Sequence, residues 1–425
     1  MKASLTSYLS ERSEKKQVPN FASSECSQDE RIQVIYQRFH TLLKSRAKRG
    51  LLRSLSVTKQ NEIDFSSNDY LGLARSQLFI ESVKKESEKD SLRCVGSTGS
   101  RLLTGNSQYA EDLEKYIASF HCSESALLFN SGFTCNLSVV GYVAQKEDLI
   151  IVDELAHSSV REGCKLSRSK VCVFPHNDTE YLRTLLKNTV GVDGFKGSVF
   201  VVVESIYSMD GDFAPVEQLL EICLDFGTHL IVDEAHSVGV YGERGEGIIQ
   251  KKGLGQHPCL FMRVVTFGKA FGCHGAAALC RSIVREYLIN YARPLIYSTS
   301  LSYHSLCCIR VAYSLMDTPQ LSERRRRLFH VIDYFRSKSR SLLGDRLLDR
   351  PQSPIQAVLV PGNENCVYIA NTLRQQNISV YPIRSPTVPS GAERIRITLH
   401  SHNTLEEIDD LIRILASSDL FRARF

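Results

Sequence analysis

The sequence predicts an α/β fold with a mainly parallel central sheet, helices on both faces, and a smaller α+β C-terminal domain. From about residue 61, short runs rich in Val and Ile alternate with segments of helical periodicity. Such alternation is typical of parallel sheets with right-handed crossovers. The runs are apolar at consecutive positions, which favours strands covered on both faces. We therefore expect a layered domain with the sheet in the middle.

Seven apolar runs are predicted to be strands of this sheet. They are residues 125–130, 148–153, 170–175, 197–205, 229–236, 263–268 and 276–280. Apolar residues at helical spacing predict helices between most of them, for example over residues 107–120 and 215–227.

The chain is expected to have three parts. Residues 1–60 form an N-terminal extension, with a polar, mobile or loosely docked segment of about 30 residues before a basic helix and an arm. Residues 61–302 form the large domain. Residues 303–425 form the C-terminal domain, with long helices over 303–345, three strand-like segments and a closing helix.

The composition narrows the class of protein. The 425 residues are 43% hydrophobic and 23% charged, an ordinary globular balance, and the net charge of +5 favours neither a nucleic-acid-binding nor a membrane-surface protein. Thirteen cysteines without a C-x-x-C pair favour reduced thiols, and hence a cytoplasmic protein. No histidine or cysteine spacing predicts a metal site. The sequence shows no apolar signal region and no run of about 18 apolar residues, so we expect no signal peptide and no membrane span.

Two predicted strand ends carry the strongest cluster of reactive side chains. Asp233 and His236 end one apolar strand, and Lys269 follows the next, three residues after Thr266. Ligands collect at the carboxyl ends of parallel strands. A buried Asp233 needs a cationic partner, such as the protonated pyridine nitrogen of pyridoxal phosphate (PLP). Lys269 would have to lose its proton, through burial or a nearby cation, to bond a cofactor carbonyl. The alternative for Lys269 is an ordinary surface lysine.

Nine motifs in chain order resemble those of one family. They are SSNDYLGLA (66–74), GSTGSRLLTG (96–105), FNSGFTCN (129–136), DELAHSS (153–159), ESIYSMDGDFAPV (204–216), DEAHSVGVYGERG (233–245), TFGKAFG (266–272), ARPLIYSTS (292–300) and IRSPTVPSGAERIRIT (383–398). On these motifs the chain resembles the α-oxoamine synthase family of fold-type-I PLP-dependent transferases. That resemblance implies PLP as the cofactor and a homodimer with shared active sites.

The resemblance implies cofactor-binding roles along the whole large domain. Lys269 would bind PLP covalently and shuttle a proton, Asp233 would pair with the ring nitrogen, and His157 would stack on the ring; a core histidine is the alternative for His157. Ser208 and His236 would bond the ring's hydroxyl region. The phosphate would be held by Ser131, Gly132, Phe133 and Thr266, and by Ser298 and Thr299 across a dimer interface. Of these residues, Lys269, Asp233, His157 and His236 are the predicted catalytic residues.

Four further residues are implied to bind substrates. Arg384 would clamp the amino-acid carboxylate with Thr387 beside it, and Asn68 would line the same site. Arg53, in the N-terminal arm, would lie near the acyl substrate. The alternatives are a surface ion pair for Arg384 and a solvated side chain for Arg53.

The resemblance also implies a reaction, the decarboxylative condensation of an amino acid with an acyl thioester. The segments ARPLIYSTS and IRSPTVPSG favour L-alanine and a pimeloyl thioester, as in biotin biosynthesis, over a glycine-using ligase. Whether the thioester carries coenzyme A or a carrier protein stays open. A catalytically silent partner subunit is another alternative, although Lys269 argues against it. The glycines of residues 96–105 fit neither a P-loop nor a dinucleotide fingerprint, which disfavours a dehydrogenase and favours a mobile active-site loop.

Overall fold

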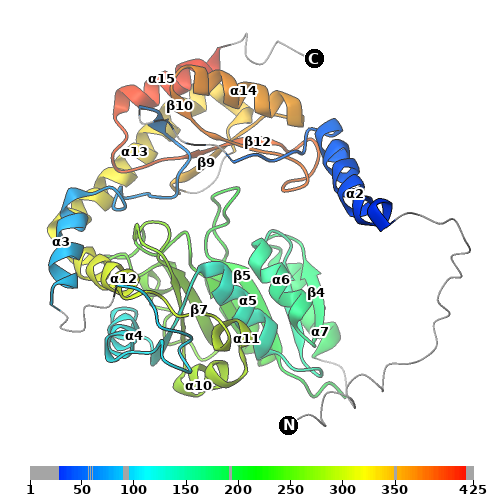
Figure 1. Cartoon of the computed structure of the whole chain (residues 1–425), viewed down its shortest axis with the longest axis vertical. Coiled ribbons are helices and arrows are strands. Elements are labelled where there is room, and N and C mark those ends of the chain that lie inside the picture. Colours follow the sequence, from blue (N-terminus) through cyan, green and yellow to red (C-terminus); the bar gives the residue numbers. More distant parts are fainter. Residues whose placement is uncertain are drawn as a thin grey trace, which may run out of the picture. The chain divides into compact units, whose positions relative to one another are not determined.

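The computed structural model in Figure 1 describes residues 28–55, 57, 59, 61–89, 95–190, 194–348 and 352–417. They fall into two compact units, one ending at Val57 and the other containing all later residues. The first unit contains helix α2 (Gln28–Lys48), which begins three residues before the predicted basic helix. Almost all of the predicted mobile N-terminal segment lies outside the described residues.

A seven-stranded sheet forms the centre of the second unit. Its strands are β2 (Ser125–Phe129), β3 (Leu149–Asp153), β4 (Lys170–Phe174), β5 (Val199–Glu204), β6 (His229–Asp233), β7 (Leu260–Thr266) and β8 (Ala276–Cys280), in the spatial order β2-β8-β7-β6-β5-β3-β4. Strand β8 runs antiparallel to the other six strands, which are all parallel to one another. The predicted mainly parallel sheet is therefore confirmed.

Helices cover both faces of this sheet, as its two buried clusters show. One face packs against α5 (Gly132–Val143), α6 (Ser158–Leu166), α10 (Ser282–Tyr291) and α11 (Arg293–Ile296). The other packs against α4 (Gln108–Phe120), α7 (Thr179–Thr189), α8 (Val216–Phe226) and α12 (Tyr303–Met316). Strand alternation divides the side chains, so that Val202 joins the first face while Val201 and Val203 join the second.

Two strands differ from their predicted form. β4 was expected to be covered on both faces, but it lies at the sheet edge, where Val171 and Val173 are exposed. β7 starts at Leu260, three residues earlier than predicted. The polar Arg263 inside β7 is buried because its guanidinium donates to Glu234, with 2.6 Å between Nε and Oε2.

The C-terminal segment forms a smaller α+β assembly. It contains α13 (Pro319–Leu343), η1 (Gly344–Arg346), β9 (Ile355–Leu359), α14 (Asn363–Gln375), β10 (Ile378–Ser379), β11 (Tyr381–Ile383), β12 (Arg394–Thr398) and α15 (Leu405–Ala416). Strands β11, β12 and β9 make an antiparallel sheet, and Figure 1 shows α13, α14 and α15 gathered beside it. Strand β1 (Ile63–Asp64) pairs with β10, so residues assigned to the large domain hydrogen-bond the C-terminal segment. The domain boundaries at 60 and 302 stay predictions.

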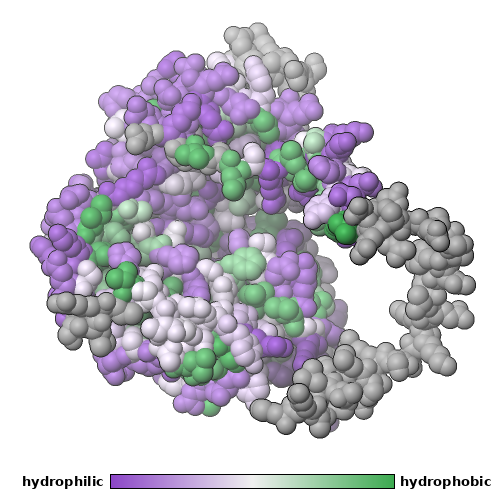
Figure 2. Space-filling view, viewed as in Figure 1, coloured by the Kyte–Doolittle hydropathy of each residue, from purple (hydrophilic) through white to green (hydrophobic). Residues whose placement is uncertain are grey.

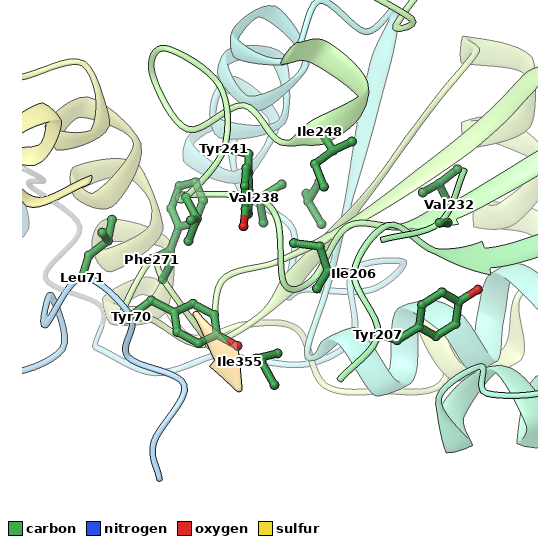
Figure 3. Packing of buried hydrophobic residues seen from close by; sticks show 14 of the residues in the cluster. Tyr70, Leu71, Ile206, Tyr207, Val232, Val238, Tyr241, Ile248, Phe271 and Ile355 are labelled. Atoms are coloured by element: carbon green, nitrogen blue, oxygen red, sulfur yellow. The ribbon is translucent and has the colours of Figure 1, made fainter. Parts of the chain in front are cut away.

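A loop-rich layer of buried apolar residues connects the central sheet with the segment that follows β1. Figure 3 shows Tyr70, Val238, Tyr241 and Phe271 close together, with Ile355 of β9 beside the Tyr70 ring. The remaining helices, α3 (Gln77–Ser87) and α9 (Ile248–Lys251), add Phe79, Ile248 and Ile249 to the core. This packing fixes the segment 65–73 next to the loops that follow β6 and β7.

On the face seen in Figure 2, hydrophilic residues predominate and the apolar ones lie in small separate groups. All cysteines in the described ranges are free. None of the helices in those ranges is both long and apolar enough to cross a membrane.

Candidate active site

Lys269 lies in a chain of hydrogen-bonding side chains at the carboxyl end of the sheet. Its Nζ is 2.7 Å from Nε2 of His236, whose Nδ1 is 2.6 Å from the hydroxyl of Tyr70. Burial lowers the pKa of Lys269 to about 8, against the opposing effect of the nearby Asp233 and Glu204 carboxyl groups. Burial also holds the pKa of His236 well below its ordinary value, helped by the Lys269 cation. His236 is therefore neutral, and an unprotonated Lys269 amine is accessible near neutral pH.

Asp233 is the last residue of β6 and is buried. Its Oδ2 accepts a hydrogen bond of 2.6 Å from Asn136 Nδ2 on α5, and its Oδ1 accepts one of 2.9 Å from the Ala235 backbone N–H. Both oxygens of this buried carboxyl group therefore accept a hydrogen bond. The same Asn136 donates to Ser159 Oγ, which links α5 to the start of α6.

His157 caps the N-terminus of α6 and keeps an exposed ring. Its Nδ1 lies 2.7 Å from Ser159 Oγ. Desolvation lowers the pKa of His157, while the Asp233 carboxylate partly offsets that effect. An exposed neutral imidazole beside a buried carboxylate suits stacking on a bound aromatic ring, so its assignment as a cofactor contact stays our prediction.

The N-terminus of α5 and the end of β7 meet at Gly132 and Thr266. A Cβ on Gly132 would lie 3.3 Å from the Thr266 hydroxyl oxygen, so the missing side chain leaves a close approach between the two. The Ser131 hydroxyl caps α5 by accepting from Thr134 N–H at 3.1 Å. Phe133 is exposed at the same helix start. These positions form an N-terminal helix turn with free backbone N–H groups, a suitable cradle for a phosphate.

A buried arginine that was not predicted lies at the other side of the Lys269 cluster. The Arg396 guanidinium donates to the Ser208 carbonyl at 2.7 Å, to Thr398 Oγ1 at 3.0 Å and to Asn68 Oδ1 at 3.0 Å. It also contributes to the lowered pKa of Lys269. No carboxylate within the described ranges pairs with it, so this buried cation can accept an anionic ligand. Two predicted residues, Asn68 and Ser208, thus meet around Arg396.

The other predicted residues lie apart from this cluster or outside its unit. Ser298 and Thr299 line a small pocket together with Asn130 and Thr134, and Asn130 Nδ2 donates to the Thr299 carbonyl at 2.7 Å. No described contact joins Arg384 or Thr387 to Lys269; they occupy the turn after β11, where Thr387 is exposed. Arg53 belongs to the first unit. The roles of these five residues stay predictions.

Some of the newly found residues had a signal in the sequence. In the run RIRIT, Arg394 and Arg396 alternate with Ile395 and Ile397, which puts both arginines on one face of a strand. Arg394 forms a buried ion pair with Asp210, and Arg396 does not. Asn136 and Tyr70 lie within the motifs, but the sequence does not predict their contacts with Asp233 and His236, because these contacts arise from tertiary packing.

Comparison with known proteins agrees with this geometry. Residues 60–415 match the family described as aminotransferase class I and II. The chain belongs to this family. It is 39% identical over 396 residues to 8-amino-7-oxononanoate synthase of Emericella nidulans, covering 88% of this chain and 93% of the relative. It is 36% identical to the enzyme of the same name from Citrobacter koseri, covering 86% of this chain and 92% of that one.

Solved structures support the same fold. A serine palmitoyltransferase from S. paucimobilis with bound PLP superposes with a TM-score of 0.80 at 23% identity, covering 91% of this chain and 98% of that chain. The 8-amino-7-oxononanoate synthase of Francisella tularensis superposes with a TM-score of 0.69 at 28% identity, covering 84% and 98%. The predicted resemblance to PLP-dependent acyltransferases and the predicted fold are confirmed.

The residues present fit PLP as the cofactor. Lys269 offers an amine with a lowered pKa, Asp233 offers a buried carboxylate, and Gly132 beside Thr266 leaves a helix N-terminus open to a phosphate. Within the described ranges, no group of three or more His, Cys, Asp or Glu side chains is arranged to hold a metal ion. The site therefore has the groups that PLP requires: an amine, an anion for its ring nitrogen and N–H groups for its phosphate.

Proposed function

We propose that this enzyme condenses L-alanine with a pimeloyl thioester to give 8-amino-7-oxononanoate, CO₂ and free thiol, a step of biotin biosynthesis. The proposal depends on Arg396, which is buried near Lys269 and has no carboxylate partner in the described ranges. It also depends on the 39% identity of the chain to an 8-amino-7-oxononanoate synthase. A cation for the amino-acid carboxylate and an amine for the cofactor are both needed in one pocket, and here they lie together.

Each residue of the cluster has a role in this reaction. Arg396 would bind the carboxylate of the amino acid and orient its α-carbon toward Lys269. Lys269 and Asp233 would hold PLP, which when bound would supply an electron sink for the charge that develops at that carbon. The Lys269 amine would take the α-proton and later return one. Tyr70 holds the neutral His236 ring, and His236 in turn holds Lys269 Nζ in line for that transfer.

Further residues would complete the cofactor and substrate contacts. His157 would stack on the ring, Ser208 and Thr266 would bond its polar groups, and the N–H groups of the segment 131–133 would hold its phosphate. Asn68, which accepts from Arg396, would position that arginine for the substrate. Arg53, Arg384 and Thr387 are proposed to contact the acyl substrate from outside this cluster, and Arg396 takes the place of Arg384 as the proposed clamp for the amino-acid carboxylate.

Assembly and location are part of the same proposal. We propose a homodimer in which Ser298 and Thr299 reach the phosphate of the partner's site, with coenzyme A or a carrier protein bearing the acyl group. The free cysteines of the described ranges favour a reducing compartment, and we propose the cytoplasm.

A product assay tests the function. Purified enzyme with PLP is offered L-alanine, glycine or L-serine, each with pimeloyl, acetyl or palmitoyl thioesters, and CO₂, free thiol and the amino ketone are measured. We expect the highest kcat/KM with L-alanine and the pimeloyl thioester. A preference for glycine with the acetyl thioester would identify a different acyltransferase of this family, and no turnover with any pair would indicate a silent subunit.

A further inference from the structure

Glu204 lies beside Asp233 and has no role in the reaction described above. It ends β5, which is parallel to β6, and the two residues are register partners. Phe200 and Val202 of β5 share a buried cluster with Ile231 of β6, so alternation puts both acidic side chains on the same face as α5 and α6. Two carboxyl groups therefore lie next to each other at the carboxyl end of the sheet.

The hydrogen bonds of this pair are unequal. Both Asp233 oxygens accept a hydrogen bond, from Asn136 and from the Ala235 backbone. Glu204 is 2% exposed, and its Oε1 is buried without a hydrogen-bond partner among the described residues. An ionised oxygen in that position would be costly, and two adjacent buried carboxylates repel each other. A single proton on Glu204 removes both costs. A proton on Asp233 would instead weaken the two hydrogen bonds that Asp233 accepts.

We propose that Glu204 keeps its proton at neutral pH and is a positioning residue that leaves Asp233 as the single ionised carboxylate of the pair. The groups that face Glu204 agree with this state. Burial raises the pKa of Glu204 to about 8, with further raising by Asp233 and Asp153 and lowering by Lys269 and the His157 backbone N–H. At pH 7 about nine-tenths of the Glu204 carboxyl groups are therefore protonated.

The proton on Glu204 also affects Lys269. Ionised Glu204 would raise the pKa of Lys269, as Asp233 does. When Glu204 is neutral, Asp233 is the one anion of the pair that acts on Lys269, so the Lys269 amine loses its proton more easily. The pair thus divides its tasks: Asp233 offers the negative charge for a pyridine nitrogen, and Glu204 avoids adding a second charge that would hold Lys269 as an ammonium.

Infrared spectroscopy of the PLP-loaded enzyme without substrate tests the protonation state directly. Wild type at pH 6.5 should show the carbonyl stretch of a buried carboxylic acid, shifted by ¹³C-labelled glutamate, absent in Glu204→Gln, and lost in wild type as the pH rises through about 8. Glu246→Gln is the matched control, since this buried carboxylate accepts from Arg244 and should contribute no such band. Absence of a Glu204-dependent band at pH 6.5 overturns the proposal.

A pH profile distinguishes positioning from a merely structural role. At pH 7 Glu204→Gln should keep kcat within about twofold of wild type, because the amide resembles a neutral carboxyl group. By pH 9 the ratio of the variant's kcat to the wild-type kcat should change by up to about tenfold, because the wild-type Glu204 carboxyl is then ionised and the amide is not. A tenfold loss already at pH 7, or a ratio that is constant with pH, overturns the proposal. The infrared result requires no substrate, so it stands or fails independently of the proposed reaction.

Discussion

Replacing Arg396 with lysine tests whether the structure has identified the carboxylate-binding residue. Ser208, Thr398 and Asn68 accept from three of the five N–H donors of this arginine, and the Tyr70 hydroxyl is a further partner, which leaves at least one donor for a ligand. Lysine keeps the charge but loses the planar pair of donors, and one lost hydrogen bond to a charged group is worth about 1.5–3 kcal/mol. The Kd of L-alanine should therefore rise about 10- to 150-fold.

The assay is a spectroscopic titration of the PLP-loaded enzyme with L-alanine, with D-alanine as the ligand control. Arg384→Lys is the matched variant, because the sequence motifs favoured Arg384 as the clamp while no described contact joins it to Lys269. We expect Arg384→Lys to leave the Kd of L-alanine within about threefold of wild type, less than the loss of one such bond. If Arg384→Lys weakens binding strongly and Arg396→Lys does not, the assignment from the structure is wrong.

Three further predictions concern proton binding and packing. Since the pKa of Lys269 is lowered to about 8, PLP uptake by the PLP-free protein should accelerate with pH and level off above about 8 in stopped-flow absorbance; a rate that still climbs near pH 10 would contradict this. Against the opposing effect of burial, the carboxylates of Asp153 and Asp212 on either side of His176 raise its pKa from 6.5 to about 9, so its stabilisation is complete below pH 6.5 and is lost as the pH rises through 9. His176→Phe should then lower the free energy of unfolding in urea by about 3 kcal/mol at pH 6 and by much less at pH 10, whereas equal losses would refute the linkage. Gly132→Ala places a Cβ 3.3 Å from Thr266 Oγ1 and should weaken PLP binding about tenfold in a fluorescence titration, against no change if this turn lies away from the cofactor.

The sheet could be predicted because its strands are covered on both faces. Consecutive apolar residues in 149–152 and 199–203 favour strands buried on both faces, and the structure confirms them. The edge strand β4 was misjudged, because the run KVCVF is equally apolar although it has a neighbour on one side only. Strand order within a sheet is a tertiary property that the local pattern does not contain.

The candidate site was predictable where a motif fixes a residue next to a strand end. Asp233 ends β6, His236 follows β6 and Lys269 follows β7, and the structure brings the three together. Arg396 was missed because its function depends on which of two alternating arginines finds an acidic partner: Arg394 pairs with Asp210, and Arg396 stays available. Glu204 was likewise hidden, since its proton depends on its register with Asp233.

The central claim is that Lys269 anchors PLP in this site, and mass mapping after borohydride reduction tests it most directly. Reduction fixes the bond between the cofactor and its lysine, so proteolysis and mass spectrometry identify the modified residue. We predict the pyridoxyl phosphate mass on the peptide containing Lys269, with loss of the label and of turnover in Lys269→Ala, whose fold is checked by circular dichroism. A label on another lysine, or full labelling of Lys269→Ala, would contradict the account.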